Sequence, residues 1–360
     1  MAFLTLSNGT VFEGQRIGAH VDCVGEVVFT TGMEGYLETL TDPSYYGQIV
    51  TQCFPLIGNY GLIPADFEGK PRLFGYIVRE LCDTPSNFRS EGRLNDYLAD
   101  HGIPGLCGVD TRELVRTVRE EGVMNAVISD SVPADLSAIR AYRVEGAVAA
   151  VTRKERRVYP AEGEKRFRVA LMDYGAKRGI LRSLQSRGCE VTVWPAGTSA
   201  EDVLAEDPNG IMLSNGPGDP KEAGACVTEI RKMLGRKPVF GICLGHQLTA
   251  LALGGDTVKL KYGHRGGNQP VKDLKTGRCW ITSQNHGYAV VADSLRDVGR
   301  ETFVNLNDRS CEGMAYPELN CFTVQFHPEA SAGPKDTGFL FDRFIGMMGG
   351  SAHAKGFGRP

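Results

Sequence analysis

One cysteine of this 360-residue chain has the surroundings of a catalytic nucleophile. Cys243 stands between Gly241 and Gly245, where a short apolar segment gives way to residues that favour a helix. A tight turn from a strand into a helix lifts the side chain off the sheet edge, and the helix N-terminus favours a thiolate. The pattern indicates a nucleophile elbow with sulfur in place of oxygen. Taken alone, it fits a small buried cysteine equally well.

A histidine near the end of the chain could act as the base for this cysteine. His327 follows residues 321–326, which we interpret as a buried strand, and precedes Pro328 and Glu329. A free thiol is only a few per cent thiolate at neutral pH, so a nucleophilic cysteine needs an imidazole, and the imidazole needs an orienting carboxylate. Pro328 keeps His327 out of the helical region, which leaves Glu329 within reach of the ring. An isolated motif of this kind also fits a histidine beside a solvated glutamate.

A third motif is a loop rich in glycine and proline. It follows the apolar residues 211–213 and contains Gly216 and Gly218. Glycines let backbone N–H groups approach a ligand oxygen, although ordinary turns share this composition. The three motifs, in this order on a background of alternating strands and helices, resemble the glutamine amidotransferases of the Cys-His-Glu triad class.

Further segments narrow the resemblance to one branch of that class. Nearly the whole chain is similar to the small, glutamine-hydrolysing subunits of carbamoyl-phosphate synthetases. The segments that carry this similarity are residues 8–14, 25–29, 40–45, 55–61, 86–89, 108–112, 262–270 and 283–288. Small differences, such as Glu34 and Tyr288, leave the three triad positions intact.

The resemblance implies which residues act on glutamine. Cys243, His327 and Glu329 are the expected catalytic triad, which works through a thioester and needs no metal. The expected substrate-binding residues are Ser44, Gly216, Gly218, Leu244, Gln247, Asn285, Gly287 and Tyr288. Ser44 is equally interpretable as a capping serine after Asp42 and Pro43. On the sequence alone, His246 and His286 are better interpreted as structural, because neither has a carboxylate nearby in sequence.

The resemblance also implies a partner. The chain contains no phosphate-binding loop of the P-loop or dinucleotide-binding type, so we expect no cofactor here and expect ATP and magnesium on a larger synthetase subunit. The ammonia would serve carbamoyl phosphate synthesis for arginine, pyrimidines or both. Two alternatives remain: an amidotransferase that serves another synthetase, and a non-catalytic subunit with a relic triad. The N-terminal segments argue against the first, and the intact triad argues against the second.

The triad must be positioned by the second of two domains. We expect an N-terminal α/β or α+β domain over residues 1–150, with one helix from about 111 to 121. It is followed by an exposed connector over 151–166, an amidotransferase domain over 167–348 and a disordered tail over 349–360. Strands at 168–172, 190–194, 210–213 and 238–241 alternate with helices at 176–187, 221–235 and 244–253, and a last helix spans 338–348. This alternation predicts an α/β, doubly wound, mostly parallel sheet, whose ligands bind beyond the C-terminal ends of the strands.

Composition excludes several other classes of protein. Forty basic and forty-three acidic residues give a net charge of −3, which argues against a nucleic-acid or anionic-membrane partner. We find neither a signal peptide nor a run of about 20 apolar residues that could span a membrane. The ten cysteines form no C-x-x-C pair, which fits reduced thiols rather than a zinc site. We therefore expect a cytoplasmic protein.

Overall fold

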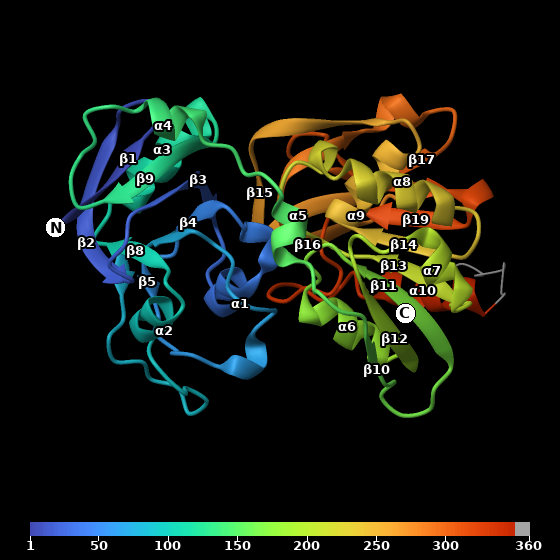
Figure 1. Ribbon diagram of the computed structural model, residues 1–360. Helices are drawn as coiled ribbons and strands as arrows, with labels where there is room; N and C mark the ends of the chain where they lie inside the picture. Colours follow the sequence, from blue (N-terminus) through green and yellow to red (C-terminus); the bar gives the residue numbers. More distant parts are fainter. Residues whose placement is uncertain (350–360) are drawn as a thin grey trace. The chain divides into compact units, whose positions relative to one another are not determined.

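The computed structural model describes residues 1–349, which form two compact units (Figure 1). The first unit comprises Met1–Ala147 together with Leu260–Gly266, and the second comprises Val148–Lys259 together with the described residues from Gly267 onward. The tail predicted over 349–360 lies, apart from Gly349, outside the described residues.

The first unit is built on a closed barrel. Within the described residues its seven strands follow one another in the order β1-β2-β8-β6-β4-β3-β9. The pairs β3–β4, β4–β6 and β6–β8 are parallel, whereas β1–β2, β1–β9, β2–β8 and β3–β9 are antiparallel. The elements of this unit are β1 (Ala2–Leu6), β2 (Val11–Gly18), β3 (Cys23–Thr30), α1 (Tyr36–Thr41), β4 (Gln48–Gln52), β5 (Leu56–Ile57), β6 (Gly75–Ile77), β7 (Glu80–Leu81), α2 (Leu94–Asp100), β8 (Pro104–Cys107), α3 (Thr111–Glu121), β9 (Met124–Ser129) and α4 (Ser137–Ala141).

Helix α3 illustrates how the sequence of this unit sets its local structure. The side chain of Asp110 accepts a hydrogen bond from the backbone N–H of Glu113 and so caps the first turn. Leu114 and Val118, four residues apart on one face, are buried against strand residues of the same core. The helix has the predicted bounds, 111–121. The closure into a barrel was not predicted, because it depends on strands far apart in sequence, such as β1 and β9.

The second unit contains a ten-stranded sheet in the order β10-β12-β11-β13-β14-β19-β18-β16-β15-β17. After α5 (Ala147–Val151), its elements are β10 (Arg157–Tyr159), β11 (Phe167–Asp173), α6 (Arg178–Gln185), β12 (Cys189–Pro195), α7 (Ala200–Ala205), β13 (Gly210–Leu213), α8 (Gly224–Met233), β14 (Val239–Ile242), α9 (Leu244–Ala252), β15 (Asp256–Asp273), β16 (Cys279–Val291), β17 (Arg300–Asn305), β18 (Cys311–Tyr316), β19 (Cys321–Val324) and α10 (Phe339–Met348).

Helices cover both faces of this sheet, which confirms the doubly wound α/β arrangement. Strand β11 shows the reason: Ala170 and Met172 belong to a core shared with α7, α8 and α9, whereas Val169 and Leu171 belong to a core shared with α6 and α10. Consecutive strand residues point to opposite faces, so a strand buried on both sides is apolar throughout.

Two expectations about this unit need correction. The sheet is parallel only across β12, β11, β13, β14 and β19, and the remaining strands extend it with antiparallel pairs. In addition, the segment predicted as an exposed connector contains β10, which pairs antiparallel with β12 at the sheet edge. Its charged composition hid a strand that is exposed on most of its side chains.

The three neighbouring strands β13, β14 and β19 position the candidate site. They are parallel, so their C-terminal ends lie at one edge of the sheet, where ligands bind in folds of this type. The glycine-proline loop, Cys243 and the segment carrying His327 follow these three strands. As for membranes, none of the helices within residues 1–349 is long and apolar enough to cross one.

Candidate active site

Cys243 occupies a strained turn between β14 and α9. Its backbone angles are φ 52° and ψ −103°, an unusual conformation for a residue other than glycine, and it is the N-cap of α9. Its N–H donates to Val324 O of the neighbouring strand at 2.8 Å, and its thiol approaches Asn285 O at 3.6 Å. The side chain is buried, with an exposed fraction of 3%. Such strain at the apex of an elbow is typical of nucleophiles.

The glycines on either side are required by close backbone approach. A Cβ on Gly245 would lie 2.4 Å from Leu213 O, and a Cβ on Gly241 would lie 2.9 Å from Gly245 O. Both distances are shorter than real Cβ contacts, so any larger residue would push β13, β14 and α9 apart. The spacing of two glycines around Cys243 is therefore a packing condition for the elbow.

His327 and Glu329 form a buried pair beside this turn. The two side chains are nearly inaccessible, and His327 Nδ1 lies 2.6 Å from Glu329 Oε1. A carboxylate only accepts, so Nδ1 carries the proton and donates it, which leaves Nε2 as the acceptor in the neutral ring. Nε2 forms no hydrogen bond within the described residues, and the Cys243 thiol is close enough to the ring to affect its pKa. Hydrogen bonds between catalytic groups are often poorly aligned until substrate binds.

A lysine that was not predicted from the sequence pairs with the carboxylate of Glu329. Lys177 is buried, and its Nζ lies 3.1 Å from Glu329 Oε1 and donates to Ser331 O at 2.8 Å. Its position just beyond strand β11, at the same sheet edge as the other motifs, was the only signal that could have indicated it. The site therefore contains an ammonium, a carboxylate and an imidazole in contact.

The pKa values follow from these contacts. Burial by itself raises the pKa of Glu329, but Lys177 and His327 outweigh it and lower that pKa to about 2. Burial by itself lowers the pKa of His327, but the Glu329 carboxylate outweighs it and raises that pKa to about 10. A protonated imidazole next to a carboxylate is thus favoured at neutral pH, and this is the state in which histidine stabilises a neighbouring thiolate.

The glycine-proline loop packs directly against the turn after β11. A Cβ on Gly216 would lie 2.2 Å from Tyr174 O and 2.7 Å from a methyl group of Leu244, so only glycine fits. Gly218 has φ 90°, a left-handed conformation that favours glycine. Leu244 contributes the first N–H group of α9, one of the helix N–H groups that have no intrahelical partner. This edge of the sheet can therefore present backbone donors to a developing oxyanion.

The other predicted substrate residues fall in two places. Gln247 is buried and donates from Nε2 to Tyr288 O at 2.9 Å and to Gln325 Oε1 at 3.0 Å, which ties α9 to the strand bearing Asn285, Gly287 and Tyr288. The structure thus brings these residues next to Cys243. Ser44 is buried in the first unit, in the turn Pro43–Tyr45, where Asp42 rather than Ser44 supplies the capping side chain. Its part in substrate binding stays a prediction.

The two additional histidines are held by protein groups. His246 is fully buried, its Nδ1 lies 2.7 Å from Thr323 Oγ1, and burial lowers its pKa to about 3. The nitrogens of His286 lie 2.8 Å from Tyr288 O and 3.0 Å from Gln284 Oε1. These contacts support the structural interpretation of both rings.

Comparisons with known proteins identify the family. Residues 170–347 match the glutamine amidotransferase class-I family model, and residues 4–128 match the CPSase domain of the carbamoyl-phosphate synthase small chain. The carbamoyl phosphate synthase small chain of Fusobacterium nucleatum is 52% identical over 95% of this chain and 96% of its own length. Those of Clostridium perfringens and Symbiobacterium thermophilum are both 51% identical, over 96% of this chain and 98% of their own lengths. The chain belongs to the family of carbamoyl phosphate synthase small chains and is a glutamine amidotransferase of class I.

Proposed function

We propose that this chain hydrolyses L-glutamine to glutamate and ammonia through the triad Cys243, His327 and Glu329. The observation that carries the proposal is the 2.6 Å contact between His327 Nδ1 and Glu329 Oε1 directly beside the strained Cys243. The strained turn presents the nucleophile, and the charged pair beside it supplies both a base and an acid.

The reaction has two halves. Cys243 gives its proton to His327 Nε2, and the thiolate attacks the amide carbon of the glutamine side chain, which places a negative charge on the former carbonyl oxygen. When the tetrahedral intermediate collapses, the C–N bond breaks, and the proton on Nε2 passes to the leaving nitrogen as ammonia departs. A thioester on Cys243 remains. Water then attacks this thioester while His327 takes its proton, and glutamate leaves as the thiol is restored.

Backbone donors supply the remaining stabilisation. Gly216, Gly218 and Leu244 are the proposed source of N–H groups for the oxyanion. Gly216 packs against Leu244 at the start of α9, and Gly218 belongs to the same loop after β13. Gln247, Asn285, Gly287, Tyr288 and Ser44 are the proposed contacts for the rest of glutamine. Two aligned N–H donors in a buried site account for about 10²-fold or more in rate each.

The partner we propose is the large subunit of carbamoyl-phosphate synthetase. The relatives are named as small chains of that enzyme, and no phosphate-binding loop occurs in this sequence. We therefore assign the ATP-dependent steps, with their magnesium, to the partner. The partner receives the ammonia and makes carbamoyl phosphate for the synthesis of arginine, pyrimidines or both. The proposed location of the complex is the cytoplasm. The barrel unit is the proposed docking platform.

The first prediction concerns the nucleophile. We expect Cys243→Ser to abolish glutamine hydrolysis, because a serine hydroxyl does not form the anion that a thiol forms beside His327. Carbamoyl phosphate synthesis from free ammonia should persist in the complex with the large subunit. Cys226→Ser is the matched control, because it changes another buried thiol. Cys226 lies in α8, and its thiol contacts Ala196 O. Near-normal glutaminase activity of Cys243→Ser would eliminate the triad assignment.

The second prediction compares the other two members of the triad. His327→Asn removes the base and should lower kcat by at least about 10³-fold, whereas Glu329→Gln leaves a less basic imidazole and should cost about ten to a hundred times less. Steady-state glutaminase kinetics on both variants provide the measurement. If His327→Asn matched the wild type, another base would be at work, and His286 would be the next candidate.

The third prediction concerns coupling to the partner. Hydrolysis without a waiting acceptor wastes glutamine, so we expect the isolated chain to turn over slowly and to accelerate in the complex when ATP and bicarbonate are present. The interface should reach at least the standard size of about 1,600 Å². Glutaminase rates are to be compared for the chain alone, for the complex, and for the complex with both ligands. A high rate that is indifferent to all additions would favour a free-standing glutaminase.

A further inference from the structure

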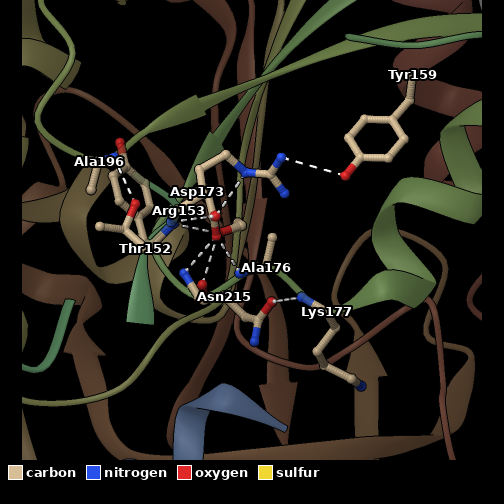
Figure 2. Close-up of polar contacts among 11 residues, drawn as sticks. Thr152, Arg153, Tyr159, Asp173, Ala176, Lys177, Ala196 and Asn215 are labelled. Atoms are coloured by element: carbon tan, nitrogen blue, oxygen red, sulfur yellow. Dashed lines mark hydrogen bonds and ion pairs between the residues drawn. The ribbon is translucent and has the colours of Figure 1, made fainter. Parts of the chain in front are cut away.

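A carboxylate outside the proposed triad receives four N–H groups from two segments of the chain. Asp173 is buried at the C-terminal end of β11 (Figure 2). Its Oδ1 accepts from Gly175 N at 3.1 Å and Ala176 N at 2.8 Å. Its Oδ2 accepts from Arg153 N at 3.0 Å and Arg153 Nε at 3.1 Å. Charge-assisted bonds of this number fix the geometry of both segments.

The first segment is the turn that delivers Lys177. Asp173 fixes the two preceding N–H groups, and Asn215 Oδ1 accepts from Lys177 N at 3.0 Å. The backbone of Lys177 is thereby held from two sides, with its side chain extending away from Asn215 (Figure 2). The ammonium ends 3.1 Å from Glu329 Oε1. In a buried site such a contact is less screened than in water, so displacement of the ammonium weakens its interaction with the carboxylate more than it would at the surface.

The same turn supports the glycine-proline loop. Tyr174 N donates to Ser214 Oγ at 2.9 Å, and Tyr174 O is the atom that a side chain on Gly216 would strike. These loop contacts are made by the backbone of Tyr174 and not by the Asp173 carboxylate, whose own bonds hold the stretch from Gly175 to Lys177.

The second segment is the stretch after α5 that contains Arg153. The guanidinium lies between Asp173 and Tyr159, with its Nη1 3.5 Å from the Tyr159 hydroxyl and its carbon 5.7 Å from the ring centre (Figure 2). The adjacent Thr152 accepts from Ala196 N at 2.9 Å. These contacts hold Arg153 in place, so that it locks the Asp173 carboxylate in the orientation that the turn requires.

We propose that Asp173, locked by Arg153, is a positioning residue of the glutaminase reaction that holds Lys177 against Glu329. The inference rests on the proposed triad and deepens it. Asp173 touches neither the substrate nor the reacting atoms in this scheme; it acts through Lys177. A merely structural role, the capping of a turn by an aspartate, predicts lost stability without any change in how the site titrates.

The first test is Asp173→Asn, which keeps an acceptor oxygen for the turn and removes the charge that holds Arg153. We expect kcat to fall about ten- to a hundredfold while KM changes less than about threefold, because misplacement by about an ångström has this cost. The acid limb of the pH profile should move to higher pH. The sign follows from charge: Glu329 must be ionised, the Lys177 ammonium lowers its pKa, and displacement of that ammonium therefore raises the pH at which Glu329 becomes protonated. An unshifted profile would contradict the proposal.

The second test is a double-mutant cycle with Lys177→Met. If Asp173 acts through Lys177, then Asp173→Asn should cost nothing more, in kcat or in the position of the acid limb, once Lys177 is gone. Multiplicative losses would show that Asp173 acts independently, and this would overturn the proposal. If Asp173→Asn does not fold, Asp173→Ser keeps a hydroxyl acceptor for the turn and serves in the same cycle.

The matched control is Asp342→Asn, which breaks the Arg187–Asp342 ion pair, 2.7 Å long, elsewhere in the same unit. Its kcat and pH profile should equal those of the wild type. If Cys243→Ser is inactive but Asp173→Asn behaves like Asp342→Asn, the positioning role fails and the triad stands. If Cys243→Ser stays active, the triad itself fails.

Discussion

The proposed site depends on one buried carboxylate, that of Glu329, keeping its charge. Burial by itself raises the pKa of Glu329, and a protonated Glu329 could not hold an imidazolium beside Cys243. Lys177 and His327 offset this cost together, because Lys177 Nζ and His327 Nδ1 both contact Glu329 Oε1. Removing either partner of such a cluster leaves an unpaired buried charge, so the three groups have to be placed together. The turn after β11, which carries Lys177, and the segment after β19, which carries His327 and Glu329, bring the three groups together.

A second constraint is steric and belongs to the backbone. Three parallel strands end at one edge of the sheet, and the segments that follow them must pass one another at very short distances. The contacts at Gly216, Gly241 and Gly245 leave no room for a Cβ. These glycines allow α9 to begin directly after Cys243 and the loop after β13 to pack against its first residue, Leu244. The close backbone contacts at these glycines and the charged groups of the site therefore lie at the same edge of the sheet.

Sequence patterns predicted the parts of this arrangement that are local. The α3 helix was predictable because the features that form it, the capping Asp110 and the buried Leu114 and Val118, lie close together in the sequence. Cys243, His327 and Glu329 were recognisable because the residues that position them are their immediate neighbours in the sequence. The comparisons support the family, and the placement of the triad within the site remains a proposal that the geometry supports.

Features that depend on distant contacts were missed for physical reasons. Lys177 lies 152 positions before Glu329, and no local pattern relates an ammonium to a carboxylate so far along the chain. The barrel closes through pairing of β1 with β9, and β10 adds to the sheet through β12, a strand reached only after α6. The antiparallel part of the sheet was missed largely because its two long strands, β15 and β16, carry many polar residues that hide their periodicity.

The most direct test of the central claim is to trap the covalent intermediate during turnover. The chain, in complex with its large subunit, ATP and bicarbonate, is mixed with isotopically labelled glutamine, quenched rapidly in acid, digested and analysed by mass spectrometry. If Cys243 is the nucleophile, a labelled glutamyl group will be found on the peptide that contains Cys243, and hydroxylamine will release it as expected of a thioester. Turnover with the label on another residue, or undiminished turnover after Cys243 has been alkylated, would contradict it.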